Sequence, residues 1–241
     1  MNQILVKDLK HIEYGEAWDY QELLMKRGLD IKSLRFTNPE QTPDPISHYL
    51  LLCEHPHVYT LGKSGVQENL LINNERMEEL GVTFYKTNRG GDITYHGPGQ
   101  LVAYPILDLE QYETDLNKYM RNLEEVIIRT IATFGITSSR SKGETGVWID
   151  VEDPVKARKI CAMGVRSSRW ITLHGLALNV NTEMEFFNHI VPCGIVDKSV
   201  TSMEQELGHA VDFEKVKEVF YECFAEVFES ELIHKTPEEI L

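Results

Sequence analysis

The sequence predicts an α+β fold: a mixed, largely antiparallel β-sheet with helices packed against it. The chain has 241 residues, which is enough to bury one sizeable core. Short β-rich runs follow one another in groups, and helices fall between the groups rather than after every strand. No internal repeat interrupts this order. We therefore expect residues 1–241 to form a single domain.

The strands are predicted from short runs of β-branched, aromatic and aliphatic residues. In chain order these runs are Ile4–Leu9, Tyr49–Glu54, Val58–Leu61, Thr83–Lys86, Asp92–Tyr95, Leu101–Leu107, Gly146–Ile149, Lys159–Val165 and Ile171–Asn179. Residues 37–47 contain three prolines, which predicts a surface loop rather than a linker between domains.

Three helices are predicted from apolar residues at a spacing of three or four. The first runs from about Gly15 to Lys26. The second follows Thr114, and Gly135 lies where a helix stop is expected. The third covers about residues 212–230, where it opens near Asp212 and carries glutamates on its outer face.

Composition excludes several classes of protein. The chain has 24 Lys and Arg against 38 Asp and Glu, a formal net charge of −14, which argues against a nucleic-acid or anionic-membrane binder. Its apolar runs are shorter than the roughly 20 residues of a membrane span, and its N-terminus lacks a signal-peptide pattern. Four cysteines without a CxxC pair do not indicate a disulfide scaffold. We expect a cytoplasmic protein and a monomer.

Two signals that resemble known motifs do not support a cofactor. Gly62-Lys63-Ser64 matches the end of a phosphate-binding loop, but His57 stands where that loop needs its first glycine. Cys53, His55 and His57 alternate as metal ligands could, but Pro56 disturbs the strand and no fourth ligand is evident. We expect neither a metal nor another cofactor.

Two stretches concentrate residues suited to chemistry. Arg89–Gln100 holds four glycines together with an arginine and a histidine, so its backbone can approach a ligand closely. A hairpin with a wide turn would explain the glycines, but not the presence of Arg89 and His96 beside them. In the second stretch, Lys159 begins an apolar strand, and lysines held against apolar surroundings can act as bases near neutral pH. A strand-end lysine that reaches into solvent is the commoner alternative.

One cysteine differs from the other three. Cys193 lies between Pro192 and Gly194 in a predicted loop, outside any apolar periodic run. An accessible thiol beside a lysine can serve as a nucleophile. By this physical criterion alone, a loop cysteine is more often incidental.

Taken together, these segments resemble a known family. The sequences Arg89–Gln100, Lys159–Arg166, His174–Val180 and Pro192–Gly194, preceded by Cys53–Gly62 and Thr145–Trp148, resemble the lipoyl(octanoyl) transferases of lipoate biosynthesis. These enzymes are also called octanoyl-[acyl-carrier-protein]–protein N-octanoyltransferases. The resemblance covers about residues 48–204 in the right order, and it is specific only as a set.

The resemblance implies a fold, an activity and a site. The fold would be that of the catalytic domain of biotin and lipoate protein ligases. The activity would be ping-pong transfer of an octanoyl group from octanoyl-acyl carrier protein to a lysine of lipoyl domains. Cys193 would carry the acyl thioester and Lys159 would be the base. The implied substrate contacts are Arg89, Gly90, Gly91, Asp92, Ile93, Thr94, Tyr95, His96, Ala162, Met163, Gly164, Gly175, Leu176 and Ala177.

Three alternatives remain open at the level of sequence. An ATP-dependent lipoate or biotin ligase would use the lysine to bind an acyl-adenylate and would need no nucleophilic cysteine. A non-catalytic module would bind acyl carrier protein or lipoyl domains without turnover. A metal protein built on Cys53, His55 and His57 is the third. Cys161, two residues from Lys159, is the internal rival to Cys193 as nucleophile.

Overall fold

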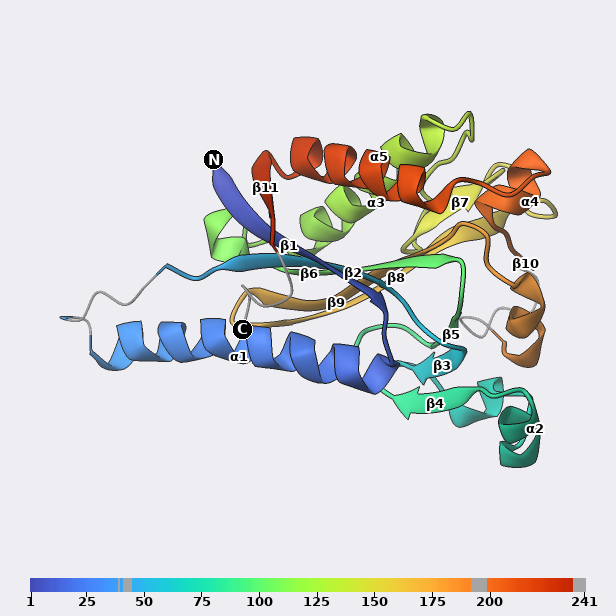
Figure 1. Cartoon of the computed structure of the whole chain (residues 1–241), viewed down its shortest axis with the longest axis horizontal. Coiled ribbons are helices and arrows are strands. Elements are labelled where there is room, and N and C mark those ends of the chain that lie inside the picture. The colour runs from blue at the N-terminus through green and yellow to red at the C-terminus, as the bar shows by residue number, and fades with distance from the viewer. Residues whose placement is uncertain (39, 41–44, 192–198, 236–241) are drawn as a thin grey trace.

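The computed structural model describes residues 1–38, 40, 45–191 and 199–235. Its strands form two sheets, and helices cover both faces of the larger one (Figure 1). The elements are β1 (Asn2–His11), α1 (Tyr14–Thr37), β2 (His48–Glu54), β3 (Val58–Leu61), η1 (Gln67–Asn69), α2 (Asn74–Glu79), β4 (Thr83–Lys86), β5 (Ile93–His96), β6 (Gln100–Ile106), η2 (Leu109–Gln111), α3 (Leu116–Ala132), β7 (Val147–Ile149), β8 (Arg158–Ser168), β9 (Ile171–Asn179), η3 (Met184–His189), β10 (Ser199–Val200), α4 (Met203–Leu207), α5 (Phe213–Val227) and β11 (Ser230–His234).

The large sheet is antiparallel at its centre and parallel towards its edges. Its strand order is β10-β8-β9-β6-β2-β1-β11, and β7 pairs with β8 off this path. The pairs β8–β9, β9–β6 and β6–β2 are antiparallel, whereas β10–β8, β2–β1 and β1–β11 are parallel. The small sheet, β4-β3-β5, combines one parallel and one antiparallel pair. The predicted mixed α+β fold is confirmed.

The predicted strands all form, and two further strands were missed. β3, β4 and β9 have the predicted bounds, and β8 continues past its predicted end to Ser168. Strands β10 and β11 are short and gain their regular structure from their partners β8 and β1. The predicted third helix ends at Val227 rather than near residue 230, because Ser230–His234 join the sheet as β11.

The first helix was predicted too short. α1 does not end at Lys26 but continues to Thr37. Gly28 lies inside it, where a glycine usually weakens a helix. A side chain at Gly28 would place its Cβ only 2.6 Å from Cδ1 of Ile171 on β9. Gly28 therefore allows α1 to pack closely on the sheet, and this packing outweighs the local preference.

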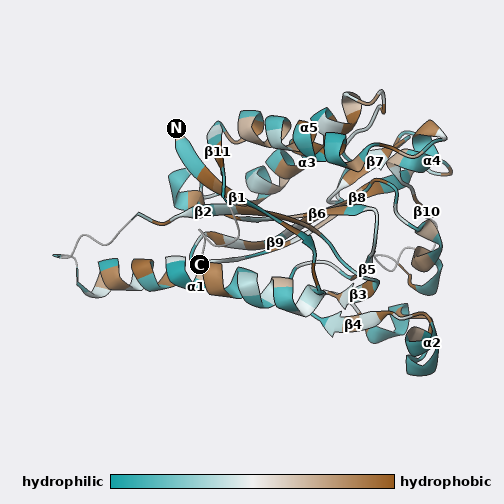
Figure 2. Ribbon diagram, in the orientation of Figure 1, coloured by the Kyte–Doolittle hydropathy of each residue, from teal (hydrophilic) through white to brown (hydrophobic). Residues whose placement is uncertain are grey.

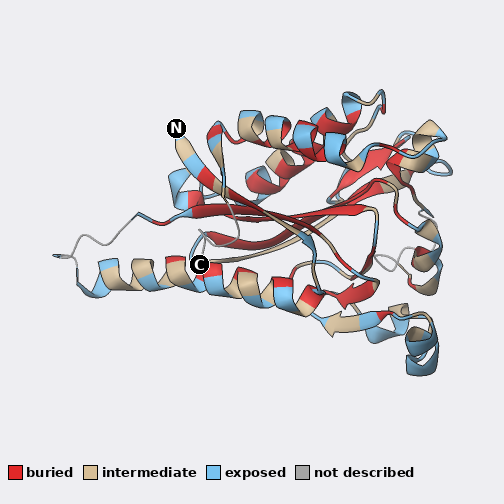
Figure 3. Cartoon of the chain, viewed as in Figure 1, coloured by how far each residue is buried: buried red, intermediate tan, exposed pale blue. Residues whose placement is uncertain are grey.

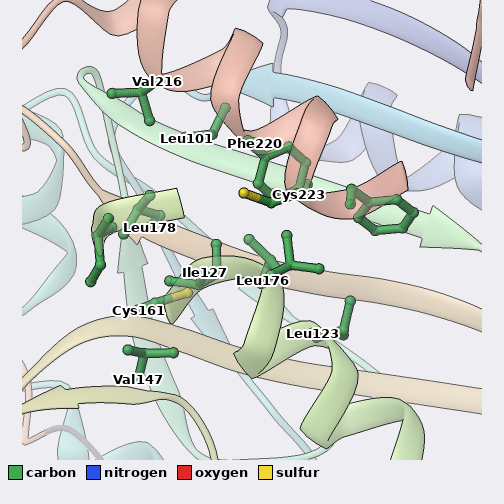
Figure 4. Packing of buried hydrophobic residues seen from close by; sticks show 14 of the residues in the cluster. Leu101, Leu123, Ile127, Val147, Cys161, Leu176, Leu178, Val216, Phe220 and Cys223 are labelled. Carbon is green, nitrogen blue, oxygen red and sulfur yellow. The ribbon is translucent and has the colours of Figure 1, made fainter. Parts of the chain in front are cut away.

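The second and third helices follow their predicted patterns at the start. Asp115 caps α3 by accepting hydrogen bonds from the N–H groups of Asn117 and Lys118. Asp212 caps α5 in the same way through the N–H of Lys215. Both helices pack on one face of the large sheet, and Figure 4 shows their side chains meeting those of the strands. Each large apolar side chain buried here contributes roughly 1.5–3 kcal/mol.

The opposite face of the sheet packs against α1, with Ala17, Leu24 and Met25 in this second core. A third, smaller core joins the small sheet to η3. The central strands are the most hydrophobic and most buried parts of the chain, whereas α2 is largely hydrophilic and exposed (Figures 2 and 3). No helix in the described part of the chain combines the length and apolar character needed to cross a bilayer.

Candidate active site

A cavity lies between the two sheets. The small sheet contributes β5 and the loop before it, and the large sheet contributes β6, β8 and β9. The cavity together with its open mouth encloses about 850 Å³ of space. Of the residues predicted to contact the acyl substrate, all but Gly90 and Tyr95 line it. Their role in binding stays a prediction.

The loop that carries Arg89–Asp92 is held by backbone hydrogen bonds on both sides. The N–H of Gly62 donates to the carbonyl of Asp92 at 3.2 Å, and the N–H of Gly90 donates to that of Val165 on β8 at 3.0 Å. A Cβ at Gly62 would lie 2.2 Å from the carbonyl oxygen of Gly91. The segment that resembles a phosphate-binding loop, Gly62-Lys63-Ser64, therefore holds the loop at the cavity wall in place through its backbone.

Arg89 is buried and its guanidinium faces the protein. Nη2 donates to the backbone oxygen of Thr60 at 2.6 Å and to its Oγ1 at 2.9 Å, while Nη1 donates to the carbonyl of Gly90 at 2.9 Å. These bonds tie the loop to β3. The fixed positive charge also influences the histidines of the cavity.

His96 belongs to a buried chain of hydrogen bonds. Its Nδ1 lies 2.8 Å from Oε1 of Gln100, whose amide donates to Asn179 at 2.8 Å; Asn179 in turn donates to the carbonyl of Thr201 at 2.9 Å. Burial, together with the nearby His55, lowers the pKa of His96 to about 3. His96 is therefore neutral near pH 7, with its Nδ1–H directed at Gln100.

His174 also lines the cavity. It begins the segment His174–Val180 of the family resemblance, but no role was predicted for it. Its Nε2 lies 2.6 Å from Oδ1 of Asn88, and its backbone N–H donates to Oε1 of Gln21. Burial, and then the charges of Arg89 and Arg166, lower its pKa to about 3. Its φ of +61° lies in the left-handed region, a strained conformation that is often found at functional sites.

Lys159 lies at one end of the cavity, half-buried near the start of β8. Its ammonium nitrogen is 4.6 Å from the centre of the Trp148 ring, with which it pairs across β7 and β8. On its other side it pairs with Val200 of β10, and its carbonyl accepts a hydrogen bond from the N–H of Thr201. The side chain is thus placed by strands on both edges of β8.

The predicted nucleophile, Cys193, lies outside the described residues. The chain is fixed on both sides of that segment. Val191 donates its N–H to the carbonyl of Asn69 at 2.8 Å, and Ser199 pairs with Arg158, next to Lys159. The pairing of Cys193 with Lys159 stays a prediction.

The rival nucleophile, Cys161, faces away from the cavity. It is fully buried in the core between the large sheet and α3 and α5 (Figure 4). Burial raises the pKa of its thiol far above the ordinary range. Burial raises the thiol pKa of Cys53 as well, and Cys53 does not line the cavity. Neither has the accessible, ionisable thiol that a nucleophile needs.

The alternating Cys53, His55 and His57 do not converge on one point. His55 binds the backbone oxygen of Ile12 and the hydroxyl of Tyr104, whereas His57 binds the hydroxyl of Tyr95, each at 2.7 Å. Within the described ranges, no group of three or more His, Cys, Asp or Glu side chains could hold a metal ion.

Sequence reasoning did not assign several residues that line the cavity. These are Tyr14, Gln100, Val102, Tyr104, Thr145, His174, Asn179, Phe187 and Val200. Four of them lie in the segments that carry the family resemblance: Gln100, Thr145, His174 and Asn179. Their polar side chains could therefore have indicated a role in the site. The others are aromatic or apolar residues that only the tertiary structure brings to the cavity.

Comparison with known proteins identifies the class of enzyme first. The family model of the lipoyl protein ligase A/B catalytic domain matches residues 13–225. The bipartite lipoate protein ligase of Thermoplasma acidophilum has the same fold, with a TM-score of 0.67 at 16% identity, covering 99% of this chain and 88% of that one.

Relatives of higher sequence identity show to which group of enzymes within this family the chain belongs. The octanoyltransferase of Christiangramia forsetii is 53% identical over 231 residues, which cover 95% of this chain and 97% of the relative. That of Flavobacterium psychrophilum is 54% identical over 233 residues, with 95% and 98% covered. The chain therefore belongs to the lipoyl protein ligase A/B catalytic-domain family and, within it, to the octanoyltransferases. It is an acyltransferase enzyme.

Proposed function

We propose that this protein transfers an octanoyl group from octanoyl-acyl carrier protein to a lysine of lipoyl domains, through a thioester on Cys193. The acceptors would be the lipoyl domains of 2-oxoacid dehydrogenases and of glycine-cleavage type proteins. The observation that carries the mechanism is the place of Lys159: it lines the cavity and pairs with β10, the strand that follows the Cys193 segment. The bipartite ligase of Thermoplasma acidophilum belongs to a lipoylation system with its own E2 lipoyl domain, which supports the choice of acceptor.

The reaction would proceed in two transfers. Lys159 accepts the proton of the Cys193 thiol, and the thiolate attacks the thioester carbonyl of the donor. The C–S bond to the carrier then breaks, and the carrier thiolate takes the proton back from Lys159 and leaves as a thiol. In the second transfer the acceptor amine attacks the new thioester, loses a proton to Lys159, and releases Cys193. Both steps conserve the acyl group and need no cofactor.

The acyl chain would lie along the apolar part of the cavity wall. Val102, Met163, Leu176, Ala177 and Phe187 contribute this surface. Each methylene buried there is worth about 0.8 kcal/mol, so the fit of an eight-carbon chain yields substantial affinity but discriminates only modestly against neighbouring lengths.

The main alternative is an ATP-dependent ligase of the same fold. A lipoate-protein ligase A with bound ATP matches this chain with a TM-score of 0.67. Its sequence identity of 15% is too low to indicate a shared activity, so the match shows only a shared fold. The relatives that are about half identical are octanoyltransferases. Transfer from free octanoate that depends on ATP would favour the ligase.

An acidic carrier protein would need basic residues near the cavity mouth. Most of the basic residues between positions 86 and 180 already form ion pairs within the protein, namely Lys118, Arg121, Arg129, Arg140, Lys156, Arg158 and Arg166. Lys142 is exposed, three residues before Thr145 of the cavity. We assign Lys142 to the surface on which the carrier protein docks. We further propose that the protein is cytoplasmic, monomeric and built of one catalytic domain.

The decisive experiment is the intact mass of the protein after mixing with octanoyl-carrier protein, before and after hydroxylamine. We expect one octanoyl group, labile to hydroxylamine and located on Cys193 by peptide mapping. Cys193→Ala should carry none and should not transfer. Lys159→Ala should slow both half-reactions by roughly 10²–10⁴-fold. A Cys193→Ala protein that transfers at the wild-type rate, or an acyl group on Cys161, would overturn the mechanism.

A further inference from the structure

Asp92 lines the cavity, yet both of its carboxylate oxygens are bound by the protein. Oδ1 accepts the N–H of Ile93 and Oδ2 accepts an N–H from the side-chain amide of Asn69, each at 2.7 Å. The space around the carboxylate is shaped for it, because a Cβ at Gly65 would lie 2.3 Å from Oδ1. This arrangement fits a structural link better than a contact with an apolar acyl chain.

Asn69 connects Asp92 to the chain that leads into the Cys193 segment. Its backbone oxygen accepts the N–H of Val191 at 2.8 Å, and the N–H of Leu71 donates to the carbonyl of His189 at 2.8 Å. Residues 69–71 and 189–191 therefore form a short antiparallel ladder. The side chain of Asn69 is held by the cavity loop, while its backbone holds Val191.

The segment just before this ladder is fixed to the same small sheet. The Phe186 ring stacks on His57 at 4.1 Å between centroids and on Tyr95 at 5.1 Å. The hydroxyl of Tyr59 donates to the carbonyl of Phe186 at 2.7 Å. With η3 held in this way, the Asp92–Asn69 bond is the direct side-chain link between the loop at the cavity and Val191.

We infer that Asp92 is a positioning residue rather than a substrate contact. Through Asn69 it sets the place of Val191, two residues before Cys193, relative to the loop that lines the cavity. This inference rests on the proposed function, in which Cys193 carries the acyl group. Loss of the link should slow the acylation of Cys193 without weakening the binding of the donor.

An exchange of the two side chains tests the link. Asn69→Asp sets two carboxylates against each other, whereas Asp92→Asn replaces the charge-assisted bond by a weaker bond between two neutral amides. The double variant restores one N–H···O⁻ bond, and the amide oxygen that it introduces at position 92 can still accept the N–H of Ile93. We expect Asn69→Asp to lower the acylation rate at saturating donor about tenfold, the effect of losing one charge-assisted hydrogen bond, and Asp92→Asn to lower it by a smaller factor, both with the donor KM unchanged. The double variant should recover most of the rate.

Asn73→Asp is the matched control. It adds the same charge four residues away and keeps the cap of α2, because a carboxylate can also accept the N–H of Arg76. It should acylate at the wild-type rate. Asn69→Leu, which removes the amide without adding charge, covers the case in which Asn69→Asp does not fold.

Three outcomes would overturn the inference: single variants that acylate at the wild-type rate, a double variant no faster than either single one, or an Asp92→Asn protein altered only in donor KM. A wild-type protein that never acquires a hydroxylamine-labile group on Cys193 would instead overturn the proposed function.

Discussion

At the scale of single residues, the contact between Trp148 and Lys159 places the proposed base. The ammonium lies over the indole face, 4.6 Å from the centre of the ring. An aromatic face attracts a cation by about 0.5–2 kcal/mol, depending on how dry the site is. This attraction limits the directions in which a flexible lysine can point.

We therefore expect Trp148→Leu to lower the acylation rate by a factor of about 2–30, which corresponds to that range of energy. Trp148→Phe keeps an aromatic face and should retain most of the rate. Single-turnover formation of the acyl-enzyme measures both. Equal rates for the two variants would show that bulk, not the aromatic face, is what matters.

The sequence could indicate Lys159 but not its partner. Both residues lie in segments quoted for the family resemblance, yet they come together through the register of β7 on β8, which shifts between Val147 and Trp148. Register irregularities of this kind depend on how the strands pack. Asn69 is a clearer example: it lies in a 3₁₀ turn without any motif, and only the folded chain brings it to Asp92.

At the scale of elements, α1 is tied to the sheet by one buried lysine. Lys32 donates to Oδ1 of Asp108 at 2.6 Å and to the carbonyl of Arg169 at 2.7 Å, and it pairs with Glu110. The side chains of Lys32 and Asp108 are only 10% and 2% exposed. This one ammonium joins the second half of α1 to η2 and to the turn between β8 and β9.

Replacing Lys32 by Met should lower the free energy of unfolding by about 3 kcal/mol, because it leaves the Asp108 carboxylate buried without its cation. Urea denaturation monitored by circular dichroism measures the change, with the m-value expected to stay constant. Lys26→Met removes an exposed ion pair on the same helix and should cost less than about 1 kcal/mol. Similar losses in both variants would contradict the role of the buried pair.

The same helix shows where element prediction fails. Residues 27–37 have no clear apolar face in sequence, and Gly28 resembles a stop signal. They remain helical because tertiary contacts stabilise the helix where the local sequence does not. These contacts include the bond of Lys32 to Asp108 and the close packing of Gly28 on Ile171. By contrast, α3 was predictable, since its apolar stripe, its Asp115 cap and Gly135 at φ +84° all agree.

At the scale of the whole molecule, four buried histidines make stability depend on pH. Burial lowers the pKa of His48, and it lowers the pKa of His55 to about 4 and those of His96 and His174 to about 3. The unfolded chain takes up these protons near pH 6.5, whereas the folded protein does not. The stability from keeping them neutral is therefore complete above pH 6.5 and is lost as the pH falls towards the folded values.

We expect the free energy of unfolding to fall between pH 6.5 and pH 5 by up to about 1.4 kcal/mol per pH unit for each of His55, His96 and His174, with a smaller contribution from His48. Urea titrations across this range measure the slope. His55→Gln should reduce the slope by up to about 1.4 kcal/mol per pH unit, whereas His209→Gln, at an exposed position, should leave it unchanged. A His55→Gln profile parallel to that of the wild type would contradict this account.

The fold as a whole was largely predictable, because strand and helix periodicities agree with burial along most of the chain. The cavity was predictable in part. Gly164 was indicated by its small size in an apolar strand and Asp92 only by the family resemblance, but Tyr14 reaches the cavity from the start of α1. That approach follows from helix-to-sheet packing, which leaves no local trace in the sequence.

The parallel pairing of β1 with β11 has a consequence for synthesis. Gln3 lies opposite Glu231, 228 residues away, so β1 leaves the ribosome long before its partner strand β11. Until then the outer edge of β1, with the apolar Ile4 and Val6, stays available to strands of other chains. Translation at 5–20 residues per second makes that interval roughly 10–50 s. Nascent chains of this protein should therefore depend on chaperones more than its compact final structure suggests.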